Sequence, residues 1–152
     1  IVTMAGINVG INPFGLQDNK AIWVKPDTPA ALGKIMNEAS VAAGQMMTGS
    51  SISERLTNPD TISGINYTNI SSNFDEFVLM SKHNPNFQKA VPGAVVTNIT
   101  LQDGCDKDYS DHLTVPFNKR VWALTINALA GTQVQQVPCL VAVPMLRTVD
   151  AK

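Results

Sequence analysis

The sequence predicts an α+β fold in which a mainly antiparallel β-sheet packs against one long amphipathic helix, at about residues 29–48. Apolar residues recur at steps of three and four along that stretch, a spacing typical of a helix with one buried face. Shorter segments with alternating or continuous apolar residues precede and follow it, and these predict strands. Strands on both sides of a single helix are typical of a sheet that packs on that helix.

The N-terminal segment predicts a half-buried strand. Ile7, Val9 and Ile11 alternate with asparagine and glycine, and Pro13 ends the pattern. A helix that makes contacts through its glycines is the rival interpretation. Glycine inside a helix costs about 1 kcal/mol relative to alanine, and β-branched residues prefer strands. We therefore expect these three apolar residues to lie in a strand.

A second short strand is predicted at residues 21–25, where Pro26 ends it. The long helix follows, with Pro29 in its first turn and Gly49 just beyond its end. Its methionines are expected to pack in the core rather than to line a binding groove. The apolar stripe of this helix comprises Leu32, Ile35, Met36, Ala39, Ala42, Ala43, Met46 and Met47.

The middle of the chain carries mixed signals. Residues 51–56 predict a short capped helix that ends before Pro59. Residues 63–73 are polar and rich in turn-forming side chains, so a loop is expected there. Residues 72–82 predict another short helix, with a strand through residues 77–80 as the alternative.

The C-terminal part of the chain predicts several strands, because short apolar stretches alternate there with turn signals. Pro138 and Pro144 fall inside the last of these strands. Since proline donates no ladder hydrogen bond, this strand is expected at a sheet edge or a bulge. The predicted strands lie within residues 93–104, 112–118, 119–131 and 134–149.

Residues 103–112 hold the densest acidic cluster of the chain. Such carboxylates can bind Ca²⁺, which takes about six to eight oxygen ligands. The aspartate spacing differs from that of the helix–loop–helix calcium motif, and Lys107 lies inside the cluster. We therefore favour a solvated loop between two strands, with a calcium site as the alternative. The candidate calcium ligands are Asp103, Asp106, Asp108 and Asp111.

The two cysteines, Cys105 and Cys139, predict one disulfide. It would close a loop of about 35 residues and stabilise the fold by about 3–4 kcal/mol. The alternative is a thiol–imidazole nucleophile formed by Cys105 with His112, which lies in the same loop. No third group that would orient the imidazole is recognisable in the sequence, so the disulfide is the preferred interpretation.

Charge and composition exclude several classes of function. Only 15% of residues are charged and the formal net charge is −1, without the basic stripe that nucleic-acid binding requires. No apolar run approaches the ~20 residues of a membrane-spanning helix. Apart from the calcium alternative, no cofactor pattern is present. We therefore expect no nucleic-acid binding, no membrane insertion and no cofactor.

The low charge favours contacts between identical copies, because such a surface can be buried without stranding charges. The sequence thus predicts a non-enzymatic, self-assembling structural subunit of a homopolymeric shell, tube or filament. A virus or phage capsid or tail protein and a pilus-like appendage both fit, which places the chain in a virion or outside the cell. Residues 1–17 would form an apolar strand or extension that adds to the sheet of a neighbouring copy, and residues 18–152 a single α+β domain.

Two other functions remain open at this point. One is a monomeric extracellular module that binds carbohydrate or calcium through the loop at residues 103–112. The other is a small hydrolase whose active site the sequence does not reveal.

Overall fold

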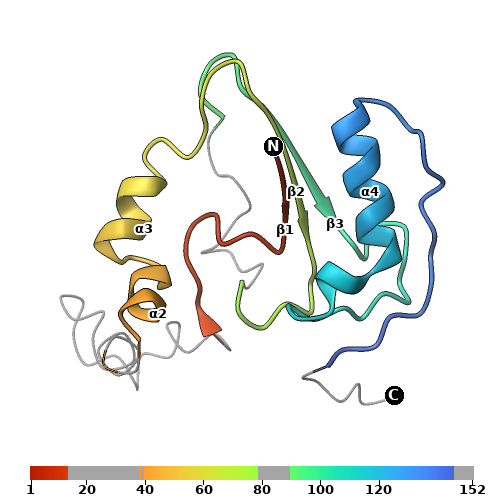
Figure 1. The fold of residues 1–152 in the computed structure, drawn as a ribbon, viewed down its shortest axis with the longest axis horizontal. Helices are drawn as coiled ribbons and strands as arrows, with labels where there is room; N and C mark the ends of the chain where they lie inside the picture. Colours follow the sequence, from red (N-terminus) through yellow and green to blue (C-terminus); the bar gives the residue numbers. More distant parts are fainter. Residues whose placement is uncertain (14–37, 39, 79–89, 146–152) are drawn as a thin grey trace.

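The computed structural model describes residues 1–13, 38, 40–78 and 90–145. Its central feature is one sheet of three strands, in which β2 (Asn66–Ser71) lies between β1 (Val2–Met4) and β3 (Val95–Thr100). Both strand pairs are parallel. Figure 1 shows the strands side by side, so that their carboxyl ends meet at one edge of the sheet.

The prediction of a mainly antiparallel sheet is therefore wrong. Alternating side chains are common to strands of either direction, whereas direction is set by the connections between strands. Of the predicted strands, the one within residues 93–104 is confirmed as β3. The loop expected at residues 63–73 is instead largely β2, the central strand.

The strand predicted at Ile7, Val9 and Ile11 does not form. The N-terminal strand is β1, which comes earlier in the chain, and Ala5 follows it with a positive φ of 48°. Ile11 makes only an isolated parallel bridge to Met47. The segment that follows Ala5 therefore leaves the sheet and packs against a helical part of the chain.

The prediction of a long helix at residues 29–48 is also wrong, as far as these residues are described. Ser40 is extended, with φ −162° and ψ 121°, and its side chain caps the six-residue helix α2 (Val41–Met46). Residues 14–37 and 39 lie outside the described residues, as does the strand predicted at residues 21–25. The capped helix predicted at residues 51–56 is confirmed as α3 (Ser51–Leu56).

The longest described helix is α4 (Lys119–Ala130), where the sequence predicts a strand. Asn118 caps its first turn by accepting a hydrogen bond from the backbone of Arg120, and Gly131 ends it at φ 68°. Val121 and Leu124 pack on the core at helical spacing. The strand prediction failed because the alternation of apolar residues here is coincidental. Part of it comes from apolar side chains that lie on the exposed side of the helix.

The other C-terminal predictions fail for local reasons. Residues 112–118 contain the 3₁₀ helix η2 (Val115–Phe117), in which Pro116 occupies the first turn. Within residues 134–145 the chain makes only an isolated bridge, between Ala142 and Asp108. Residues 72–78 form turns rather than a helix, and residues 79–89 lie outside the described part.

Helix α4 covers one face of the sheet (Figure 1). The core on this face is apolar and comprises Ala5, Ile70, Leu101, Val115 and Val121. The opposite face carries a polar row in which Thr3 of β1, Asn69 of β2 and Asn98 of β3 are in register. Among the described helices, none is both long and apolar enough to cross a membrane.

Asn69 is the centre of this polar row, and its side chain is 1% exposed. Its Oδ1 accepts hydrogen bonds from Thr3 Oγ1 at 2.6 Å and from Asn8 Nδ2 at 2.9 Å. A buried amide needs such partners, because leaving it unpaired costs about 1–3 kcal/mol. The row therefore holds the segment after β1 against the sheet.

Candidate functional site

The candidate site lies where the carboxyl ends of the strands meet. Three segments leave the sheet at this edge, at residues 5–13, 72–78 and 101–118 (Figure 1). In sheets with parallel strands, ligands bind characteristically beyond this edge, because several loops converge there. Titratable side chains of residues 72–78 and 101–118 meet at this edge.

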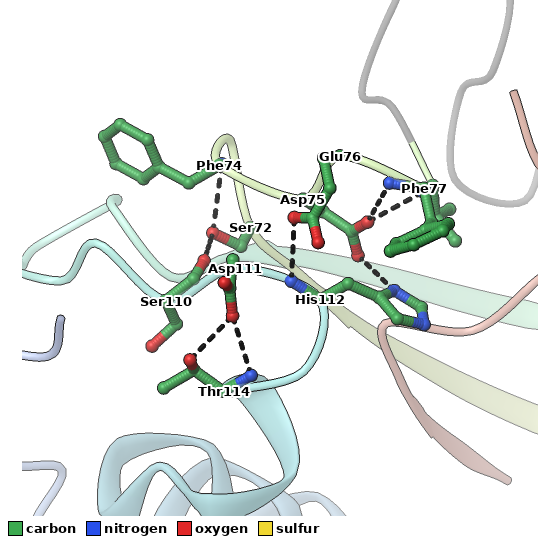
Figure 2. A network of polar contacts seen from close by, with 10 residues as sticks. Ser72, Phe74, Asp75, Glu76, Phe77, Ser110, Asp111, His112 and Thr114 are labelled. Carbon is green, nitrogen blue, oxygen red and sulfur yellow. Dashed lines mark hydrogen bonds and ion pairs between the residues drawn. The ribbon is translucent and has the colours of Figure 1, made fainter. Parts of the chain in front are cut away.

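His112 and Asp75 form a direct pair at this edge. The ring Nδ1 of His112 lies 2.9 Å from Oδ2 of Asp75, as Figure 2 shows. The Asp75 side chain is 2% exposed and that of His112 is 25% exposed. Because a carboxylate only accepts hydrogen bonds, Nδ1 carries the shared hydrogen. The other ring nitrogen, Nε2, is then the basic atom of the neutral imidazole.

Asp75 is held rigidly by its own turn. Its Oδ1 accepts hydrogen bonds from the backbone N–H groups of Phe77 at 2.9 Å and Val78 at 2.7 Å. This local pattern is characteristic of aspartate at a turn. One carboxylate oxygen is thus bound to the backbone, and the other is directed at His112.

His112 is fixed by contacts to the same turn. Its backbone N–H donates to Glu76 Oε2 at 3.3 Å. Its ring packs against that of Phe77, with centroids 5.2 Å apart and an interplanar angle of 56°. On its C-terminal side, Thr114 donates two hydrogen bonds to Asp111 Oδ1, from the backbone at 2.9 Å and from the hydroxyl at 2.6 Å.

The carboxylates around His112 raise its pKa above the ordinary value of 6.5. The hydrogen bond to Asp75 is the largest cause, and burial of the ring opposes it. The charges of Asp75, Glu76 and Asp111 raise the pKa further. The surroundings therefore stabilise the imidazolium form, which an acid–base catalyst passes through during a reaction.

Glu76 is a buried carboxylate beside the His112–Asp75 pair. It is 0% exposed, and its Oε1 has no hydrogen-bond partner. Its Oε2 accepts the His112 backbone N–H, so the side chain links the two segments that carry the pair. A buried carboxylate in this position adds to the negative potential on His112.

The predicted calcium ligands do not converge. Asp103 and Asp106 are exposed, whereas Asp108 and Asp111 are buried. Asp108 accepts hydrogen bonds from Ser110 Oγ at 2.6 Å and from the Asn118 side chain at 2.7 Å. Within residues 1–13, 38, 40–78 and 90–145, no three His, Cys, Asp or Glu side chains form a group suited to a metal. The two buried aspartates instead order the loop that carries His112.

Cys105 and Cys139 are joined in a disulfide with an S–S distance of 2.06 Å and a Cα–Cα distance of 5.3 Å. Cys105 is therefore not available as the thiol partner of His112. Near the disulfide, the Arg120 guanidinium donates to three carbonyl groups, those of Leu101, Asp103 and Pro138. The disulfide and this arginine together attach residues 138–139 to the loop that precedes His112.

The proposed assembly residues take different positions. Ile7 is exposed, whereas Val9 and Ile11 are buried against other parts of the same chain. The Val9 carbonyl accepts a hydrogen bond from Ser53 Oγ at 3.1 Å, and Ile11 packs with Met47 and Val78. Two of the three apolar side chains, those of Val9 and Ile11, are therefore buried without a neighbouring copy.

A cavity of about 280 Å³ opens beside this segment. The described part of its wall comes from residues 7–10, from α2 and from α3. Beyond this wall the chain reaches the turn that carries Asp75, where Asn12 N donates to Phe77 O at 3.0 Å. Its described lining includes Ile7, Asn8, Gln45, Met46, Ile52 and Leu56.

No protein-family model matches the chain, and no curated protein matches it in sequence.

Sequence reasoning considered His112 only with Cys105 and missed Asp75 altogether. The two are 37 residues apart, and no local spacing joins them. A signal was present in the acidic pair Asp75–Glu76, which comes shortly after the end of β2 at Ser71. Carboxylates just beyond a strand would have pointed to the site if the loop predicted at residues 63–73 had been recognised as a strand.

Proposed function

We propose that this chain is a hydrolase of esters or related acyl compounds, in which His112 is the general base and Asp75 orients it. The observation that carries the proposal is the 2.9 Å contact between His112 Nδ1 and a buried carboxylate whose other oxygen is fixed by two backbone N–H groups. An imidazole held in this way presents Nε2 as the proton acceptor.

In the proposed reaction, Nε2 of His112 takes a proton from a water molecule as the water oxygen attacks the substrate carbonyl carbon. The new carbon–oxygen bond places negative charge on the carbonyl oxygen. When this intermediate collapses, the bond to the leaving group breaks, and the imidazolium returns its proton to the departing oxygen. Asp75 stabilises the imidazolium between the two transfers.

Asn8 is suited to stabilise the negative carbonyl oxygen. Its amide nitrogen has two hydrogens, and one of them is used in the bond to Asn69 at 2.9 Å. Asn8 also lines the cavity, and in the proposed reaction its second N–H donates to the substrate oxygen. One such donor, aimed at the developing charge, contributes about 10²–10³ in rate.

The sequence predicts a non-enzymatic subunit, and that prediction remains a second candidate. The specific observation in its favour is an exposed apolar stripe on α4, formed by Trp122, Ile126 and Leu129. These side chains lie on one side of the helix at steps of four and three. The partners would be copies of the chain, and the Cys105–Cys139 disulfide supports an extracellular or virion setting, where disulfides persist.

The hydrolase proposal is tested with the purified full chain and p-nitrophenyl acetate, by following the release of nitrophenolate. His112→Gln is expected to lower kcat/KM by about 10²–10⁴, the usual contribution of general acid–base catalysis. Asp75→Asn is expected to act in the same direction. Asp106→Asn is the matched control, because Asp106 is an exposed carboxylate of the same loop. Hydrolysis that is unchanged in His112→Gln would overturn the proposal.

Size-exclusion chromatography of the same material tests the second candidate. Large uniform assemblies that dissociate on Leu129→Ser would support the structural role. A monomer at every concentration would contradict it.

A further inference from the structure

We infer that the cavity beside residues 7–10 binds an uncharged aliphatic chain of medium length, as the acyl group of the substrate. That the chain is the acyl group of a substrate rests on the proposed function. That it is uncharged and aliphatic rests on the residues that line the cavity.

The described lining of the cavity carries no charge. None of the described lining residues is ionisable at neutral pH, and its larger side chains are Ile7, Met46, Ile52 and Leu56. All four remain substantially exposed without a ligand. An apolar surface gathered in a concave site is the usual mark of a binding pocket rather than of chance exposure. A charged group would lose its hydration there without gaining a counter-charge from these residues.

The described wall of the cavity is preformed. Gly10 has φ +94°, and a Cβ at this position would lie 2.6 Å from the backbone of Thr48. The chain crosses there with two backbone hydrogen bonds, from Ile11 N to Met46 O at 2.8 Å and from Thr48 N to Ile11 O at 3.0 Å. A wall already ordered in the free protein spares the ligand part of the entropy cost of binding.

The described wall also carries amide groups. Asn8 and Gln45 are its two carboxamide side chains, which suit a carbonyl or an amide at the end of an apolar chain. The Asn8 amide lies on the polar face of the sheet, where it donates to Asn69. An acyl chain in the cavity would have its carbonyl end near these amides.

Size limits the length of the chain. The cavity has a volume of about 280 Å³, compared with ~150 Å³ for a cavity that holds benzene. An open site of this volume has room for roughly six to eight carbons. Each methylene that becomes buried should tighten binding by about fourfold.

Two measurements on the full chain test the inference separately from the proposed function. Binding of octanamide, butanamide and acetamide is measured by calorimetry or by NMR shifts, with no hydrolysis required. Affinity is expected to rise with chain length, and Leu56→Ser is expected to weaken octanamide binding by at least about fourfold. Leu129→Ser is the matched control, because Leu129 on α4 is 70% exposed and Leu56 is 72% exposed.

The kcat/KM values for p-nitrophenyl acetate, butyrate and octanoate form the second measurement. A rise with chain length that Leu56→Ser flattens and Leu129→Ser preserves would support an acyl site. Octanamide binding that depends on Leu56 without any ester hydrolysis would overturn the hydrolase while identifying the cavity as an apolar binding site. Equal affinity for all three amides, or equal loss in both leucine variants, would overturn the inference itself.

Discussion

His112 and Asp75 lie 37 residues apart in the chain, and their side chains meet at 2.9 Å beside the carboxyl edge of a parallel sheet. The pairing follows from the topology. Asp75 is in the turn after β2 and His112 in the loop after β3, and these two strands are adjacent and parallel. Loops that follow such strands begin at the same edge of the sheet, so the partners are brought together without any signal in the local sequence.

The pKa of His112 should fall when the charge of Asp75 is removed. In Asp75→Asn the largest cause of the raised pKa is lost, and the opposing effect of burial remains. NMR titration of the imidazole in the two proteins measures this change. Asp106→Asn is the control, since the pKa of His112 is not attributed to that exposed carboxylate. An unchanged pKa in Asp75→Asn would show that the two side chains do not interact in solution.

The same pair should make stability depend on pH in a defined direction. The pKa of His112 is raised in the folded protein above 6.5. Its pairing therefore stabilises the fold fully below pH 6.5, and this contribution is lost as the pH rises through the folded pKa. Urea unfolding of the wild type and of His112→Gln across this range measures the difference. A difference that grows with rising pH would contradict the assignment.

Removing the disulfide should destabilise the chain by about 3–4 kcal/mol, because it closes a loop with a sequence separation of 34 residues. The test is urea unfolding of the double variant Cys105→Ala, Cys139→Ala. Reductant should lower the stability of the wild type toward that of the variant and leave the variant unaffected. Equal stability of both proteins without reductant would mean that the cysteines are not joined.

Gly10→Ala should cost more than about 2 kcal/mol, because the new methyl group would meet the backbone of Thr48 as well as impose a left-handed φ. Gly49→Ala is the matched control. Gly49 also has a positive φ, of 79°, but a Cβ there meets nothing within 4 Å. Its expected cost is only the left-handed conformation, about 1–2 kcal/mol. Thermal or urea unfolding separates the two effects, and equal losses would exclude a close contact at Gly10.

Elements with local signals were predictable from the sequence. Helix α3 has a serine cap at Ser50 and the Asn58–Pro59 stop just beyond its end, and β3 alternates clearly. Helix α4 carried comparable signals in Asn118 and Gly131, but the apolar alternation of its middle favoured a strand. The capping residues were the better guide there, because they report backbone geometry directly.

Elements that depend on distant partners were not predictable. Strand β2 contains Asn69, a residue that is unfavourable in strands unless its amide is paired. Its partners are Thr3 and Asn8, more than 60 residues away. The direction of the sheet and the meeting of Asp75 with His112 depend on the same long-range pairing. Local pattern therefore could not reveal either the central strand or the site beyond it.

The polar row through Thr3, Asn69 and Asn98 also fixes the register of the strands that lead to Asp75 and His112. A shift of β2 by a single position would turn the Asn69 amide toward the apolar core beneath α4. The amide would then be buried without hydrogen-bond partners. The same slip would move Asp75 by about 3.3 Å relative to the neighbouring strand, far enough to separate it from His112. A chain that pairs β2 in the wrong register would therefore also lose the contact between His112 and Asp75.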